Sequence, residues 1–259
     1  MSPSSRRRPI EARPCYIYGV VGGDCPHEFE ARGLGGEPVR VVRHGDLAAL
    51  ISPAPPAGYP ATQPNVVAHE LVIEEAMRIC PVLPMRFGVV APNPRAVRDS
   101  FFRPRLVELR RLLARVAGKV ELGLKVYWPE QLVFQEIVAE NAELRALRDS
   151  LRSRPAKQTT AERVRLGQMV EADLLAKRER DAERILAALQ PLAGDLELGK
   201  ITAEMMVLNA AFLVDLERQG EFDEAMTKLH RQLGRRLIFK YLGPLPPYSF
   251  VNITLEVRR

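Results

Sequence analysis

Asp24, Cys25 and His27 stand close together near the start of the chain, and all three side-chain types bind metal ions. A metal site needs three or four ligands, and sites of this kind normally draw a second pair from a recognisable spacing elsewhere. No such pair accompanies these residues, and the other histidines are scattered along the sequence. The sequence therefore predicts no metal site and no cofactor.

His69 is the residue best placed to act as a general base, because it falls on the apolar face of a helix predicted at about 64–80. A base of this kind needs a nucleophile, and no serine or cysteine stands in an elbow motif that would supply one. We therefore interpret His69 as a hydrogen-bonded histidine of the core. Since no other catalytic constellation is present, we expect that the protein is not an enzyme.

Two glycine clusters, "GVVGG" at 19–23 and "GLGG" at 33–36, suggest phosphate binding at first sight. Phosphate sites of this type need a helix N-terminus directly after the glycines, where backbone N–H groups and the helix dipole hold the anion. The second cluster is followed by Glu37, Pro38 and a predicted strand, and neither matches GxGxxG or the Walker A pattern. We interpret both as turn or bulge glycines.

The stretch "GPLPPYSFVNITLEV" at 243–257 combines three prolines with an alternating apolar pattern. Pro244 and Pro247 satisfy PxxP, the pattern of ligands for SH3-type grooves. Such ligands are normally solvated, whereas these prolines directly precede apolar residues at every second position, namely Val251, Ile253, Leu255 and Val257. We interpret the prolines as the rigid entrance to a last strand of the protein's own core.

Apolar periodicity predicts one sheet with helices on one face in the first half of the chain. The expected elements, in chain order, are strands at 15–21, 38–45 and 47–52, a helix at about 64–80, a short strand at 81–87, a helix at 94–118 and a strand at 119–126.

The second half is predicted to start with two long helices, from Pro129 to about Pro155 and from about 161 to 190. The middle of the second helix, "AKRERDAER" at 176–184, is charged nearly all round, so we expect it on the surface or bridging domains. The last third reads β-β-α-β-β. These patterns predict an α+β protein with a disordered basic tail at 1–14, an N-terminal domain at 15–128 and a C-terminal domain at 129–259.

Composition places the chain among folded, soluble proteins. With 259 residues, 46% hydrophobic and 27% charged, it can bury two ordinary cores. Three cysteines without a CxxC pair argue against a disulfide framework and favour a reducing compartment. No apolar run approaches the roughly 18 residues that span a bilayer, so we expect a cytoplasmic protein without a membrane partner.

The net charge of +6 leaves an alternative open, a nucleic-acid-binding α+β protein. The stretch "RLIFKYL" at 236–242 comes closest to a base-stacking strand, because Phe239 and Tyr241 share a face. It lacks the RNP pattern, and most arginines are interleaved with acidic residues on predicted helices. A solvated charged surface is the better interpretation, which makes nucleic acid an unfavoured partner.

Three stretches of the sequence resemble signature stretches of the gas vesicle GvpF/GvpL family. They are "VLPMRFGVV" at 82–90, "LNAAFLVDLERQGEFDEAM" at 208–226 and "GPLPPYSFVNI" at 243–253, of which the last is the most specific. The N-terminal "YIYGVV", the "GLGG" loop and "HELVIEEA" also fall in the family's order. The arginine-rich start is extra, and the helical middle at 129–190 is not matched.

The resemblance implies an accessory protein of gas vesicle formation, located in the cytoplasm and at the gas vesicle. It implies two small α+β domains, the first ferredoxin-like, joined by long helices. It also implies binding to the hydrophobic shell protein GvpA and to other accessory proteins, assistance in nucleation or assembly of the shell, and no cofactor or catalytic residues. On this basis we expect partner contacts at Arg86, Pro244, Pro246, Pro247 and Tyr248, with folding stability as the competing role of both segments.

Overall fold

The computed structural model describes residues 13–26 and 29–253, which fall into two compact units. Unit 1 holds the chain up to Glu121 and again from Pro244, and unit 2 runs from Leu122 to Gly243. Both units combine helices with an antiparallel sheet, so the predicted α+β class is confirmed. The division differs from the expected boundary after 128, and most of the basic tail at 1–14 lies outside the described residues.

Unit 1 is built on a sheet with the order β2-β3-β1-β4, in which every pair is antiparallel and β5 also pairs with β1. This is the strand order of a ferredoxin-like sheet, with a loop that contains the short helix η2 (Leu34–Gly36) in place of the first helix of that fold. The strands are β1 (Cys15–Gly22), β2 (Arg40–His44), β3 (Leu47–Pro53), β4 (Val82–Pro84) and β5 (Val90–Ala91).

Helices cover both faces of this sheet, so the expectation of helices on one face was wrong. The helix α1 (Gln63–Ile79) packs on the face that carries Tyr16 and Tyr18, and α3 (Arg103–Val116) packs on the face that carries Ile17 and Val20. The reason is visible in β1, whose apolar residues are buried on both sides. Two short elements, α2 (Pro94–Ala96) and η3 (Val97–Phe102), precede α3.

Gly19 marks a shift in the pairing of β1 with β3, which lies between Ile17 and Gly19. A Cβ atom at this position would stand 2.8 Å from the Leu83 carbonyl oxygen of β4, so only glycine fits. The first glycine cluster therefore serves the close approach of two strands. In the second cluster Gly35 and Gly36 have positive φ angles of 67° and 74°, and no helix N-terminus follows.

A disulfide joins Cys25 to Cys80 with an S–S distance of 2.09 Å, which corrects the expectation drawn from the cysteine count. It ties the loop after β1 to the C-cap of α1. The sequence motifs that indicate paired cysteines have short, recognisable spacings. These two cysteines are 55 residues apart, and only the folding of the chain brings them together. Cys15 is a free, buried thiol, and burial raises its pKa to about 12.

Unit 2 contains a sheet with the order β7-β8-β6-β9, and one face of this sheet is covered by α7 (Gln219–Leu233). Phe222 of α7 lies between helix and sheet, with its ring centroid 5.0 Å from that of Phe212 and 6.1 Å from that of Tyr241. The strands are β6 (Lys119–Tyr127), which starts in unit 1, β7 (Asp195–Leu198), β8 (Met206–Asp215) and β9 (Ile238–Leu245). The short helix η5 (Gln190–Leu192) precedes β7, and η6 (Leu216–Arg218) connects β8 to α7.

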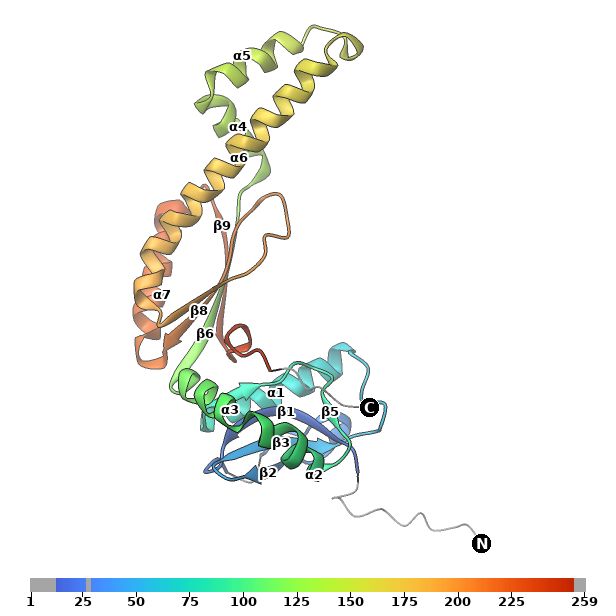
Figure 1. Cartoon of the computed structure of the whole chain (residues 1–259). Coiled ribbons are helices and arrows are strands. Elements are labelled where there is room, and N and C mark those ends of the chain that lie inside the picture. The colour runs from blue at the N-terminus through green and yellow to red at the C-terminus, as the bar shows by residue number, and fades with distance from the viewer. Residues whose placement is uncertain (1–12, 27–28, 254–259) are drawn as a thin grey trace. The chain divides into compact units, whose positions relative to one another are not determined.

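The helix expected from Pro129 to Pro155 is two helices, α4 (Glu130–Glu140) and α5 (Ala142–Leu151). Asn141 separates them, because its side chain accepts a hydrogen bond from the Leu144 backbone N–H at 3.0 Å and so caps α5. After η4 (Ala156–Gln158), α6 (Thr160–Leu189) runs beside α5 at one end and beside α7 at the other (Figure 1).

The charged middle of α6 is not wholly a surface, contrary to expectation: Lys177 and Asp181 are buried. The Lys177 ammonium lies 2.9 Å from Glu136 and 2.7 Å from Glu140, both on α4. The Asp181 carboxylate accepts hydrogen bonds from the Arg236 guanidinium at 2.6 and 2.9 Å and from the Trp128 indole N–H at 2.8 Å. Residues four apart share one helix face, and here that face is a buried ion network.

The C-terminal prolines end a strand and do not open one. The strand β9 finishes at Leu245, the short helix η7 (Tyr248–Phe250) follows, and residues 251–253 are not a strand. Val251 and Ile253 instead pack in the core of unit 1 beneath α3. The expected continuation through Leu255 and Val257 lies outside the described residues. Within the described part of the chain, no helix is long and apolar enough to cross a bilayer.

Candidate partner-binding surface

Two of the three signature stretches meet in unit 1 at His69, which α1 holds fully buried against the sheet. The ring nitrogen Nε2 lies 3.0 Å from the carbonyl oxygen of Met85 and 3.2 Å from the hydroxyl of Tyr248. On the other side, Nδ1 lies 3.1 Å from the Tyr16 hydroxyl. A residue of "VLPMRFGVV" and a residue of "GPLPPYSFV" are therefore held by the same imidazole.

The hydrogen-bond chemistry fixes the tautomer of His69. A carbonyl oxygen only accepts, so Nε2 carries the proton and donates to Met85. Tyr16 then donates its hydroxyl proton to Nδ1 and accepts the Gly88 backbone N–H at 2.8 Å. Burial lowers the pKa of His69 to about 4, which keeps the ring neutral at pH 7. The prediction of a hydrogen-bonded core histidine is confirmed.

Tyr248 is half-buried and donates its hydroxyl to Glu70 Oε1 at 2.9 Å. Burial, together with the neighbouring Glu70 carboxylate, raises the pKa of Tyr248, and burial also raises the pKa of Glu70. The hydroxyl is thus engaged within unit 1. We therefore interpret Tyr248 mainly as a residue that fixes its own segment to unit 1, and not as a polar contact for a partner.

Residues 246–251, here called the C-terminal anchor, are fixed to unit 1 at further points. The carboxylate of Glu121 accepts the backbone N–H and the hydroxyl of Ser249, both at 2.7 Å. Phe250 is buried with the Arg115 guanidinium 5.8 Å from its ring centroid. Pro246 and Pro247 are buried as well, so this segment is not available as a PxxP ligand.

Arg86 is exposed and lines a groove of about 410 Å³ on the surface of unit 1. The described residues provide no hydrogen bond and no ion pair for its guanidinium. The other walls are mainly apolar or backbone. They come from the loop before α1, from the segment around β5 and from the two residues after the C-terminal anchor: Pro56, Ala57, Gly58, Tyr59, Gly88, Val89, Val90, Asn252 and Ile253.

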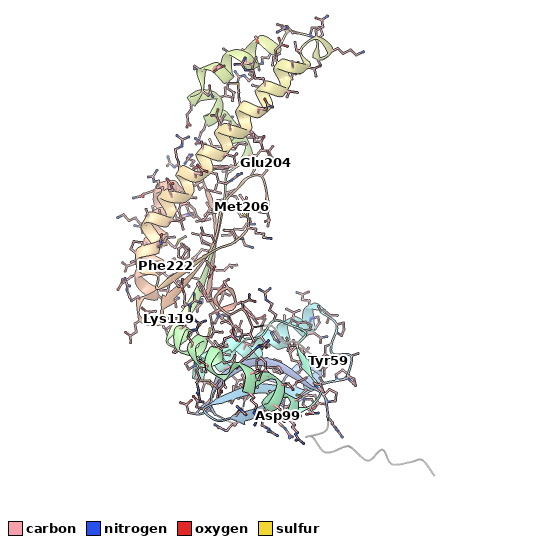
Figure 2. All side chains as sticks on the ribbon, viewed as in Figure 1. Tyr59, Asp99, Lys119, Glu204, Met206 and Phe222 are labelled. Atoms are coloured by element: carbon pink, nitrogen blue, oxygen red, sulfur yellow. A yellow bond between two sulfur atoms is a disulfide. The ribbon has the colours of Figure 1, made fainter. Side chains whose placement is uncertain are left out.

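The structure thus divides the expected contact residues into two kinds. Arg86 and Pro244 are exposed, while Pro246, Pro247 and Tyr248 are buried or half-buried in the anchor. Tyr59, which Figure 2 labels on unit 1, was missed by sequence reasoning although it is an aromatic residue in a Pro- and Gly-rich loop. The anchor connects both kinds, because Asn252 and Ile253 follow it directly and line the Arg86 groove.

The residues of the other chemical candidates are engaged elsewhere in the fold or lie outside the described residues. Cys25 is consumed by the disulfide, His27 lies outside the described residues, and residues 13–26 and 29–253 contain no cluster of three metal-binding side chains. Phe239 and Tyr241, the residues of the nucleic-acid alternative, pack against His230 and Phe222 of α7. Their rings therefore do not form a free stacking platform.

Comparisons with known proteins find similarity to gas vesicle proteins. A sequence model of the family described as "Gas vesicle synthesis protein GvpL/GvpF" matches residues 14–252. The chain is 36% identical over 240 residues to gas vesicle protein F of Streptomyces sp., covering 92% of this chain and 99% of that protein. It is 34% identical over 268 residues to gas vesicle protein L of Streptomyces sp., covering 93% and 94% respectively. The crystal structure of gas vesicle protein GvpF from Anabaena sp. PCC7120 superposes with a TM-score of 0.85 at 27% identity, covering 93% of this chain and 99% of that one.

Proposed function

The chain belongs to the GvpL/GvpF family of gas vesicle synthesis proteins, and on this premise we propose that it binds the hydrophobic shell protein GvpA and assists its nucleation or assembly. The accessory role in gas vesicle formation rests on the family and its relatives. The choice of GvpA as partner is the proposal. It extends to work in the cytoplasm and at the gas vesicle together with other accessory proteins.

The physical need for such a protein follows from the hydrophobic effect. Subunits that expose large apolar surfaces aggregate unless a partner covers those surfaces or orders them. A partner of this kind needs a preformed surface, since ordering a flexible one would consume part of the binding free energy. It needs no bond-making chemistry.

The observation that carries the proposal is the Arg86 groove. It sets a guanidinium without a partner among the described residues beside the apolar side chains Val89, Val90 and Ile253. This combination suits a segment that presents apolar side chains next to a carboxylate, because arginine binds a carboxylate in a bidentate, directional manner. In this proposal Arg86 and Pro244 contact the partner, and Pro246, Pro247 and Tyr248 hold the wall of the groove in position.

The test is co-purification of the chain with co-expressed GvpA, comparing wild type with Arg86→Ala. We expect a loss of at least about tenfold in captured GvpA, which corresponds to about 1.4 kcal/mol, within the range for a desolvated charged hydrogen bond. The melting temperature should not change, because Arg86 is exposed. Arg95→Ala is the matched control, since the Arg95 side chain is 84% exposed and does not line the groove. Equal capture by wild type and Arg86→Ala would exclude the groove, and no capture by folded wild type would exclude GvpA as the partner.

A further inference from the structure

The strand β9 forms one edge of the sheet of unit 2, because the strand order is β7-β8-β6-β9. One side of its backbone therefore has no partner strand among residues 13–26 and 29–253. It is also long for an edge strand, with eight residues against four in β7 at the other edge. Exposed edges of this kind are templates for another extended chain, and proteins usually protect them.

The two faces of β9 differ in their surroundings. Phe239 and Tyr241 point to α7, where Tyr241 donates its hydroxyl to Asp223 at 2.6 Å. Residues at every second position share a face, so Ile238, Lys240 and Leu242 form a row on the opposite side. Ile238 is 47% exposed and Leu242 is 62% exposed, which are high values for large apolar side chains in a strand.

Lys240 stands in the middle of this row with its ammonium 5.0 Å from the ring centroid of Tyr127 on β6. This cation–π contact orients the side chain along the open face of the sheet. No ion pair of Lys240 occurs among the described residues. The edge therefore presents an apolar, cationic, apolar sequence to any chain that pairs with it.

A lysine on an edge strand is a common device against aggregation, and Pro244 limits the strand further. A lysine at this position disfavours pairing with apolar or basic strands, but it does not disfavour pairing with acidic ones. It also disfavours a second copy of the chain: two β9 strands paired antiparallel about Lys240 would place two ammonium groups directly opposite each other. A shift of register by two residues would instead set an apolar side chain against each ammonium.

We propose that the free edge of β9 binds an extended strand of another protein whose residues alternate as apolar, polar, acidic, polar, apolar. Backbone hydrogen bonds would join the two strands, the carboxylate would pair with Lys240, and the apolar residues would cover Ile238 and Leu242. This surface is built from residues of unit 2, whereas the Arg86 groove is built from residues of unit 1. The proposal goes beyond the binding of GvpA and does not depend on it.

The test uses the full chain and two synthetic peptides that differ in one residue. The first peptide is acetyl-Thr-Val-Thr-Glu-Thr-Val-Thr-amide, and the second has Lys in place of Glu. Nuclear magnetic resonance titration of the isotope-labelled chain reads the backbone amides of residues 238–242 directly. We expect the Glu peptide to shift these amides and to bind about tenfold more tightly than the Lys peptide, because a cross-strand attraction is exchanged for a repulsion.

A variant in which the charge of residue 240 is reversed tests whether Lys240 pairs with the acidic residue of the peptide. Lys240→Glu changes an exposed residue and should invert the preference, so that the Lys peptide binds more tightly. Leu242→Thr should weaken the Glu peptide about threefold, whereas Leu198→Thr, at a residue that is 61% exposed on the opposite edge strand β7, should leave it unchanged. Amides of β9 that do not respond to either peptide at millimolar concentration, or a preference that Lys240→Glu leaves as it was, would overturn the proposal.

Discussion

At the scale of single residues, the centre of unit 1 is a set of buried and half-buried polar groups that form hydrogen bonds with one another. His69, Tyr16, Tyr248 and Glu70 are joined by hydrogen bonds of 2.9 to 3.2 Å. Among the described residues, no buried side-chain nitrogen or oxygen lacks a partner. A buried network of this kind specifies one arrangement, because each member left alone would lose its hydrogen bonds without regaining those to water.

Protonation of His69 should destabilise the protein in acid. Its pKa is lowered from 6.5 to about 4, so between these values the unfolded chain binds a proton that the folded chain does not. The free energy of unfolding should therefore fall as the pH drops from 6.5 to 4, by up to about 3 kcal/mol from this residue alone. Chemical denaturation of wild type and His69→Gln over this pH range measures the difference in slope. Parallel curves for the two proteins would contradict the assignment.

Tyr248→Phe should cost stability rather than binding specificity. The substitution removes the donor to Glu70 and leaves a half-buried carboxylate with one fewer hydrogen bond, for which we expect a loss of about 1 to 2 kcal/mol in the free energy of unfolding. Urea denaturation at pH 7 checks this value. If instead stability is unchanged and capture of GvpA is lost, Tyr248 is a contact residue and its place in the anchor has been misjudged.

Element-scale differences between expectation and structure have a common physical origin. Periodicity located most helices and strands of the chain, because burial on one face imposes a period of 3.6 or 2 residues. It does not reveal which core an apolar residue enters. Val251 and Ile253 fit a strand pattern but pack in unit 1 as single anchoring side chains, and Asn141 breaks a helix through a cap that the apolar pattern does not show.

The ion network of α6 could not be predicted from its charge pattern, because the pattern of Lys177 and Asp181 resembles that of a solvated helix. Removing one partner of a buried ionic network leaves the others without compensation. Asp181→Ala should therefore lower the free energy of unfolding by about 3 kcal/mol or more, since Arg236 and Trp128 both lose their acceptor. Glu183→Ala, at an exposed position of the same helix, should change it by less than about 0.5 kcal/mol. Equal effects of the two substitutions in denaturation experiments would show that the network is not buried in solution.

The disulfide between Cys25 and Cys80 links two elements that the sequence places 55 residues apart. Closing a loop of this length restricts the unfolded chain, and a contribution of about 2 to 4 kcal/mol is typical. We expect dithiothreitol to lower the melting temperature of wild type and to have no effect on the double variant Cys25→Ser, Cys80→Ser. Thiol titration of the unfolded, unreduced protein should find Cys15 alone, and three reactive thiols would refute the pairing.

For the whole molecule, the family resemblance predicted more of the function than the chemistry of individual residues did. Catalytic and metal-binding patterns were absent, and the class of the fold followed from periodicity, but the function followed only from signature stretches. The reason lies in the kind of site involved. The proposed partner surface uses ordinary residues such as Arg86, Val89 and Ile253, which the fold brings together from distant segments, and such a surface leaves no spacing rule in the sequence.

A protein that binds hydrophobic shell subunits, as proposed, should keep them from aggregating, and light scattering measures this aggregation. Purified GvpA is diluted from denaturant into buffer with or without an equimolar amount of the chain. We predict that wild type strongly suppresses the rise in scattering, that Arg95→Ala does the same, and that Arg86→Ala suppresses it about tenfold less effectively by concentration. Scattering that rises equally with and without the wild-type chain, while circular dichroism shows the chain to be folded, would rule out the proposed role in binding shell subunits.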